Sequence, residues 1–312
     1  METLRTHLDL RQDAPSGRVP GTLSSSKYRK MSPMRRCLAT SVASVNPQCR
    51  YERAIFIIGH MRCGSTALSN VLCSRDDVSG YGESHIRHWQ PGALGWLVLK
   101  QWRRGHWTPR ARHLFDKILH SYFDVESGPE FFRARAIFMV RSPAETIPSI
   151  RRLYQAIGSN KYGSDDEAAR YYTERLWTML ELWRRFAPAR RAGISHEALT
   201  SDPDGELARI GGRLGLNPPL TNSYRRPQVA MEGGVGDPLS SHKFDRIVAA
   251  STATTASEQQ NLDLAPERLG ELNALYSRCV ALFGQAVTFL LTLVCDVTAF
   301  VPASLCDMIV FA

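Results

Sequence analysis

The sequence lacks the features of several large classes of protein. Its 312 residues include only seven cysteines, and no two of them have the spacing of a zinc-binding pair. An odd number of cysteines does not suit a complete disulfide framework either, so we expect reduced thiols and a cytoplasmic location. No apolar segment of signal-peptide length follows Met1. We therefore expect neither a secretion signal nor a membrane anchor at the N-terminus.

Acidic residues are absent between positions 14 and 51. The whole chain has a formal net charge of +9, and most of that excess lies in residues 1–50. This segment is rich in serine, proline and arginine without sustained apolar periodicity, which predicts a flexible extension. An organelle transit peptide is the alternative, although Asp9 and Asp13 are unusual for one. Because the rest of the chain is only mildly basic, we expect no specific nucleic-acid partner.

The chain as a whole has the composition of a globular protein, with 43% hydrophobic and 22% charged residues. Residues 286–301 are almost continuously apolar, but a membrane span needs about 20 such residues. We therefore favour a buried end over a membrane anchor and assign the tail 286–312 no role. This leaves residues 51–285 for one α/β domain.

The apolar residues 54–58 predict a buried strand, and a glycine-bounded loop and a helical run follow it. The spacing from Gly59 to Gly64 is that of a P-loop, in which backbone N–H groups and a helix N-terminus surround a phosphate. Ser65 stands where a nucleotide-hydrolysing P-loop has its lysine, so a different phosphorylated ligand fits better. Arg62 supplies a cation within the loop.

This loop resembles the one with which sulfotransferases hold the 5′-phosphosulfate of 3′-phosphoadenosine 5′-phosphosulfate (PAPS). It is most similar to bacterial and carbohydrate-type members, whose core is Arg-Ser-Gly-Ser/Thr-Thr, with a cysteine here in place of the first serine. An ordinary strand–turn–helix with two structural glycines is the alternative interpretation. The resemblance implies that five residues bind the 5′-phosphosulfate, namely Arg62, Cys63, Gly64, Ser65 and Thr66.

A second strand–helix unit contains Arg141, which lies 79 positions after Arg62. Residues 134–140 predict a buried strand that ends at Arg141, and Ser142 with Glu145 predicts a capping box at the next helix. The unit resembles the sulfotransferase motif in which a strand-terminal arginine and a serine eight positions later contact the 3′-phosphate of PAPS. Arg141 and Ser149 have that spacing. Arginine suits this role because its planar fork can hold a phosphate through two bonds.

Glu83 follows a short predicted strand that comes after the first helix. Parallel sheets collect their functional groups at the carboxyl ends of strands. Glu83 would therefore lie near the loop between Gly59 and Gly64, here called the anion loop, if the two strands were neighbours. The resemblance implies that Glu83 is the base that deprotonates the acceptor, with His85 as the alternative base. A structural role for Glu83 at a surface turn is the other interpretation.

Other parts of the chain offer less specific signals. Residues 86–123 are rich in tryptophan and arginine, which either bind the acceptor or pack helices. An apolar stripe from Tyr172 to Phe186 predicts a core helix opened by Ser164. His196 stands where sulfotransferases usually place a tyrosine against the adenine. Lys243 stands in a late glycine-rich segment and is a candidate ligand for the 3′-phosphate, with an exposed loop as the alternative.

We therefore expect a P-loop-like three-layer α/β domain with a central parallel sheet. The resemblance implies a PAPS-dependent sulfotransferase that moves a sulfuryl group in line onto a hydroxyl or amine of a small molecule, lipid or carbohydrate. Arg62 would stabilise the leaving phosphate, and no metal would be required. A non-catalytic nucleotide- or anion-binding module and a P-loop kinase are the alternatives.

Overall fold

The computed structural model describes residues 31–225, 245–249 and 262–284. Lys243 and the apolar tail, two features singled out by the sequence, lie outside these residues. Within the described ranges, no helix is both long enough and apolar enough to cross a membrane.

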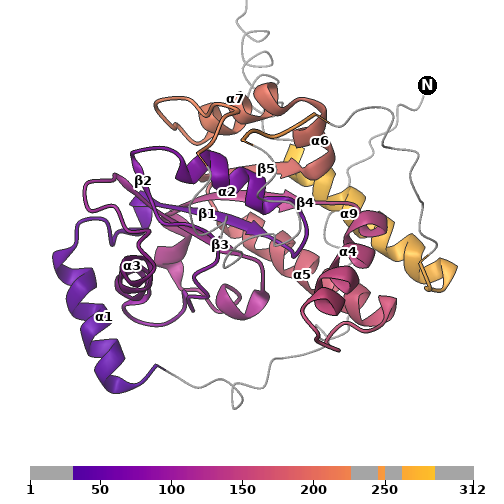
Figure 1. Cartoon of the computed structure of the whole chain (residues 1–312), viewed down its shortest axis with the longest axis horizontal. Helices are drawn as coiled ribbons and strands as arrows, with labels where there is room; N and C mark the ends of the chain where they lie inside the picture. Colours follow the sequence, from indigo (N-terminus) through magenta and orange to yellow (C-terminus); the bar gives the residue numbers. More distant parts are fainter. Residues whose placement is uncertain (1–30, 226–244, 250–261, 285–312) are drawn as a thin grey trace, which may run out of the picture.

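The core of the fold is a sheet of five parallel strands in the order β2-β3-β1-β4-β5 (Figure 1). The strands are β1 Ala54–Gly59, β2 Val78–Ser79, β3 His113–Ile118, β4 Arg135–Val140 and β5 Arg191–Ser195. Because every paired strand runs parallel, each connection must cross over one face of the sheet. The predicted parallel α/β architecture is confirmed.

Helices connect and surround the strands. The α-helices are α1 Pro33–Val45, α2 Ser65–Cys73, α3 Ala93–Arg103, α4 Pro143–Ala156, α5 Asp165–Arg185, α6 His196–Ser201, α7 Pro203–Arg213 and α9 Pro266–Gly284. Short 3₁₀ helices are η2 Tyr51–Arg53, η3 Ser121–Phe123, η4 Pro129–Arg133 and η5 Pro188–Arg190.

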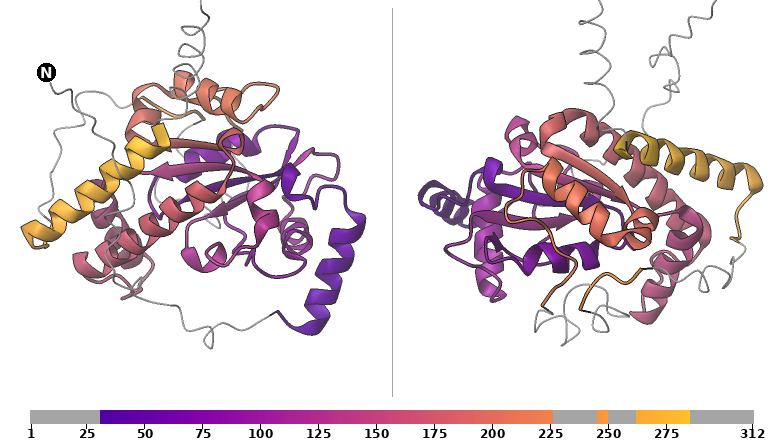
Figure 2. Two further views of the ribbon diagram at one scale, coloured as in Figure 1. Left: turned by 180° about the vertical axis from the view of Figure 1, so that it is seen from behind. Right: turned by 90° about the horizontal axis from the view of Figure 1, so that it is seen from above.

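Strand β1 is buried on both faces, which explains its continuous apolar sequence. Phe56 and Ile58 belong to a core cluster that includes residues of α3, α5 and α9. Ile55 and Ile57 alternate with them and belong to a second cluster, with residues of α2 and α7. Helices therefore lie on both sides of the sheet (Figure 2), and the three-layer prediction is confirmed.

Helix α5 agrees closely with its sequence signals. The Ser164 hydroxyl accepts a hydrogen bond from the Glu167 backbone N–H, and the Glu167 carboxylate accepts one from the Ser164 N–H, so a capping box opens the helix. The predicted apolar stripe from Tyr172 to Phe186 is buried in the core. The helix lies beneath the central strands in Figure 1.

Helix α1 was not expected, and the prediction of a flexible extension is wrong for residues 33–45. The helix packs against α3 at the edge of the molecule (Figure 1). Small side chains allow this contact, since a Cβ atom at Gly95 would lie 1.9 Å from the carbonyl oxygen of Ala39. Alanine, serine and threonine give little apolar periodicity, so the helix left no clear pattern in the sequence.

The order of the strands determines where a ligand can bind. From β1 the chain passes to β2 and β3 on one side of β1, and then to β4 and β5 on the other. Sheets of this kind bind ligands at the carboxyl ends of the strands on either side of such a reversal. The loop after β1 therefore lies between the segments that follow β3 and β4.

Candidate active site

The anion loop joins β1 to α2 through two residues with left-handed backbone conformations. Arg62 has φ = 65° and Gly64 has φ = 88°. A Cβ atom at Gly64 would lie 2.5 Å from Cδ2 of His196, so glycine also makes room for that ring. A positive φ at a residue other than glycine is strained and is found most often at functional sites. Helix α2 begins directly after the loop and directs the N–H groups of its first turn towards it.

The two predicted phosphate motifs meet in the structure. Nε of Arg62 donates a hydrogen bond to Oγ of Ser149 at 2.8 Å. Nη1 of Arg141 lies 3.4 Å from the carbonyl oxygen of Arg62, to which it donates. Arg62 lies in the loop after β1, Arg141 directly follows the neighbouring strand β4, and Ser149 lies in α4, the helix after β4. Two motifs that are distant in the sequence thus form a single cationic region.

A cavity of about 430 Å³ opens over this region. Most of the predicted site residues line it, namely Arg62, Gly64, Ser65, Thr66, Glu83, His85 and Arg141. Among the lining residues for which the sequence predicted no role, four have titratable side chains: Lys117, His120, Tyr154 and Tyr224. His196 also lines the cavity, beside the anion loop.

Cys63 has a different place from its neighbours in the loop. Its side chain is fully buried in the core below the loop, and burial raises the pKa of the thiol. A Cβ atom at Gly59 would lie 2.8 Å from its sulfur. Cys63 is not among the residues that line the cavity. Replacement of the usual serine by cysteine therefore removes no side-chain ligand from this site.

Glu83 lies beside the anion loop, although its strand is not a neighbour of β1. Strand β3 lies between β2 and β1, so the condition under which the sequence argument placed Glu83 near the loop is not met. The segment after β2 reaches the site because it crosses the end of β3, where the backbone N–H of Lys117 donates to the carbonyl oxygen of Gly82. One carboxylate oxygen of Glu83 lies 3.5 Å from Nε2 of His85. Both predicted bases therefore face the same cavity.

Lys117 is the main residue that the sequence analysis missed. Its side chain is 3% exposed, and its ammonium lies 3.3 Å from Oγ1 of Thr66 and 3.7 Å from a carboxylate oxygen of Glu83. It therefore supplies a cation between the loop and the predicted base. Strand β3 has the sequence HLFDKI and is buried throughout. Its lysine is the available signal, because a buried lysine requires partners.

His120 is a third possible proton acceptor in the cavity. It follows β3 and lies between the rings of Phe123 and Tyr171. Burial and the positive charges of Arg175 and Lys161 lower the pKa of His120 to about 3. The imidazole is therefore neutral at physiological pH, and the low pKa also makes it a weaker base than an ordinary histidine.

None of the four tryptophans of residues 86–123 lines this cavity; three of them pack against other parts of the chain, and Trp102 is exposed. The indole N–H of Trp89 donates to the carbonyl oxygen of Tyr122, and that of Trp107 donates to the Gln48 side chain. Trp96 packs against the core, with the Arg35 guanidinium over its ring. For these three tryptophans the structure favours the packing interpretation over acceptor binding.

The predicted capping box at Ser142 is absent. Ser142 precedes α4, but its side chain makes no capping hydrogen bond. Its backbone N–H donates to the carboxylate of Glu197 at 2.9 Å, while Glu145 accepts from Nε of Arg141 at 2.8 Å. Charge-assisted contacts of this kind are stronger than neutral ones, which explains why they replace the local pattern.

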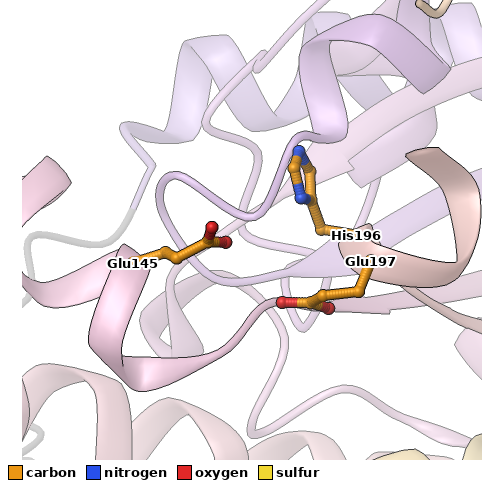
Figure 3. A group of neighbouring side chains, drawn as sticks. All are labelled: Glu145, His196 and Glu197. Atoms are coloured by element: carbon orange, nitrogen blue, oxygen red, sulfur yellow. The ribbon is translucent and has the colours of Figure 1, made fainter. Parts of the chain in front are cut away.

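Three side chains form a compact cluster at this position: Glu145, His196 and Glu197 (Figure 3). Their potential ligand atoms lie within 4.8 Å of one another. Both carboxylates already have protein partners, because Glu145 pairs with Arg141 and Glu197 also accepts from the hydroxyl of Tyr276 at 2.7 Å. We therefore interpret the cluster as a structural link between the turns after β4 and β5.

Three histidines of this region remain neutral in the folded protein. Burial lowers the pKa of His60 and of His196 to about 4, and nearby arginines add to the effect. His120, with a pKa of about 3, is the third neutral histidine. All three values lie below the ordinary histidine pKa of about 6.5. The unfolded chain therefore takes up protons at a higher pH than the folded chain does.

This difference predicts a loss of stability in mild acid. As the pH falls from 7 to 5.5, each of these histidines should lower the free energy of unfolding by roughly 1 kcal/mol, because only the unfolded state gains the proton. Urea denaturation at several pH values would measure the effect. A free energy of unfolding that stays constant over this interval would contradict the assignment of neutral imidazoles.

Residues 97–219 match the model of the sulfotransferase family. The match covers 123 of the 312 residues. The resemblance expected from the sequence is confirmed. The matched sulfotransferase segment contains β3, β4 and β5, and with them Lys117, Arg141 and Ser149. It begins after the anion loop and after Glu83, so the match does not include these parts of the site.

Three solved sulfotransferase structures are similar to this chain. A domain from the curacin biosynthetic pathway has 16% identity and a TM-score of 0.48, and it covers 74% of this chain and 96% of its own. The sulfotransferase domain of the Synechococcus PCC 7002 olefin synthase has 19% identity and a TM-score of 0.48, and the match covers 74% of this chain and 97% of that domain. The sulfotransferase from Alicyclobacillus acidocaldarius has 14% identity and a TM-score of 0.42, and the match covers 73% of this chain and 93% of that protein. No curated protein matches the sequence.

Proposed function

We propose that the protein transfers the sulfuryl group of PAPS to a hydroxyl or amine of an acceptor. The direct contact between the two cationic motifs is the observation that carries this proposal. A single nucleotide with phosphates at its 3′ and 5′ positions requires two anion sites on one cavity, and Arg62 and Arg141 both line such a cavity. Its volume of about 430 Å³ is within the usual range for small-molecule sites.

In this proposal the anion loop binds the 5′-phosphosulfate. The N–H groups of the loop and of the first turn of α2, the Arg62 guanidinium and the Thr66 hydroxyl act as donors. Arg141, which lines the cavity, binds the 3′-phosphate, and Ser149, which is 6% exposed and lies behind the lining residues, is the second ligand. The Ser149 hydroxyl accepts a hydrogen bond from Arg62, so its own proton remains available for a phosphate oxygen. His196 and Tyr224 line the cavity where they would contact the adenosine.

The transfer itself forms one bond and breaks one bond. The acceptor oxygen or nitrogen attacks sulfur, the sulfur–oxygen bond to the 5′-phosphate breaks, and adenosine 3′,5′-bisphosphate leaves. Glu83 takes the proton of the acceptor, with His85 and His120 as the other bases in reach of the cavity. Arg62 and Lys117 offset the negative charge that develops on the leaving phosphate. The position of Lys117 between Thr66 and Glu83 supports this division of roles.

The proposal can be tested with PAPS that carries radioactive sulfur. We expect the purified protein to transfer the label to at least one member of a pool of sugars, lipids and phenols, and Arg62→Ala to abolish the transfer. Arg133→Ala is a suitable control, because this arginine is exposed and pairs with Glu52 and Glu130. Binding of PAPS without release of label to any acceptor or to water would instead indicate a non-catalytic anion-binding module.

A further inference from the structure

The anion loop has little backbone support of its own. Between the end of β1 at Gly59 and the start of α2 at Ser65, the backbone N–H of Cys63 reaches the carbonyl oxygen of His60 at 3.4 Å, which is a long hydrogen bond. Arg62 lies within this stretch in a strained left-handed conformation. Such a conformation persists only when the surrounding structure holds it. The contacts that hold the loop must therefore come largely from side chains of other elements.

Helix α5 supplies several of these contacts. The guanidinium of Arg175 donates to the carbonyl oxygens of Gly59 at 2.7 Å and Ile118 at 3.0 Å. The hydroxyl of Tyr172, three residues earlier, donates to the carbonyl oxygen of Arg141 at 2.8 Å. One face of α5 thus holds the carboxyl ends of β1, β3 and β4.

Tyr171 makes the contact closest to the anion-binding residues. Its hydroxyl accepts a hydrogen bond from the backbone N–H of Met61 at 2.8 Å and donates one to the carbonyl oxygen of Leu119 at 2.7 Å. Met61 immediately precedes Arg62, and Leu119 immediately precedes His120. A single hydroxyl therefore joins two backbone segments that both line the cavity, and Tyr171 itself does not line that cavity.

The carbonyl group of Met61 is held as well. Nδ1 of His60 lies 2.8 Å from the Met61 oxygen, and Nε2 of His60 lies 3.0 Å from the backbone nitrogen of Arg141. An Nδ1–H tautomer satisfies both contacts, since it donates to Met61 and accepts from Arg141. Side chains thus fix both polar backbone groups of the residue before Arg62, and they link this residue to the ends of β3 and β4.

We propose that Tyr171 is a positioning residue for sulfuryl transfer. It holds the Met61 peptide, and through it Arg62, at a fixed distance from the segment that carries Lys117 and His120. This inference rests on the proposed function. Geometry matters at this point because a displacement of about 1 Å between reacting groups can reduce a rate by about 100-fold.

The test compares Tyr171→Phe with Tyr51→Phe. The first variant keeps the ring and removes only the bridging hydroxyl. Tyr51→Phe is the control. In the wild-type protein the Tyr51 hydroxyl donates to the carbonyl oxygen of His88, and the Tyr51 ring packs near Phe56 and Phe131. We expect hydrogen exchange in a peptide covering residues 59–66 to become at least about 10-fold faster in Tyr171→Phe alone. We also expect kcat to fall by about 10- to 100-fold in this variant, with the KM of the acceptor unchanged.

Two results would overturn the inference: unchanged exchange in residues 59–66, or faster exchange with an unchanged kcat. A decrease in melting temperature that is equal in the two variants, without a kinetic difference, would equally show a purely structural role. Failure of the wild-type protein to bind adenosine 3′,5′-bisphosphate would reject the proposed function instead. The exchange measurement does not depend on that binding, so the two failures can be distinguished.

Discussion

Replacement of Arg175 by methionine should lower the free energy of unfolding by about 3–5 kcal/mol. The guanidinium forms two hydrogen bonds of 2.8 Å with the Asp124 carboxylate, and the two side chains are 1% and 0% exposed. Methionine would leave Asp124 buried without a counter-charge, and it would also remove the donors to Gly59 and Ile118. Urea denaturation at pH 7 would measure the loss.

Arg170→Ala provides a matched control on the same helix. Arg170 pairs with Asp166 at 2.7 Å, but the side chains are 63% and 60% exposed. Ion pairs of this kind contribute at most about 1 kcal/mol. The double variant Arg175→Met, Asp124→Leu should recover part of the lost stability, because it no longer contains an unpaired buried charge. Equal losses for Arg175→Met and Arg170→Ala would refute this account of the buried pair.

Glu83→Gln should reduce kcat by about 100- to 10,000-fold, the usual contribution of a positioned base. Glutamine has nearly the same size but does not accept the proton of the acceptor at neutral pH. Affinity for adenosine 3′,5′-bisphosphate should change little, since in the proposal Glu83 contacts the acceptor and not the nucleotide. Steady-state kinetics and calorimetric titration of the bisphosphate would separate the two effects.

Three further variants make this test specific. Glu130→Gln should have no effect, because Glu130 is exposed and pairs with Arg133 at the surface. His85→Asn and His120→Asn each remove another base that lines the cavity. If Glu83→Gln retained full activity while His120→Asn lost it, the base would be His120, and the assignment of Glu83 would be wrong.

The parts of the site that were predicted from the sequence have local signals. A strand, a glycine-bounded loop and a helix identified Arg62, and the second strand–helix unit identified Arg141 and Ser149. The direct contact of Arg62 with Ser149 needed only that β1 and β4 be neighbours. Motifs of this kind can be recognised because their geometry is built within about ten consecutive residues.

The missed residues depend on the order of the strands. Lys117 reaches Thr66 because β3 lies next to β1, and nothing in its own segment indicates that neighbour. Tyr171 is a partly buried residue of α5 and contacts a loop 110 positions away in the sequence. The prediction of a capping box at Ser142 was wrong for the same reason. The backbone N–H of Ser142 donates to the carboxylate of the distant Glu197 instead of to Glu145. Sequence patterns describe local preferences, and contacts across the sheet override them.

The central claim is that two anion sites on one cavity hold a single nucleotide with phosphates at its 3′ and 5′ positions. The most direct test is the melting temperature of the protein with adenosine 3′,5′-bisphosphate, compared with ATP and magnesium. At 100 times its dissociation constant the bisphosphate should add about 2.7 kcal/mol of stability, a shift of several degrees, and Arg62→Ala and Arg141→Ala should each reduce it. Stabilisation by ATP and magnesium, with no effect of the bisphosphate, would contradict the claim and favour a P-loop kinase.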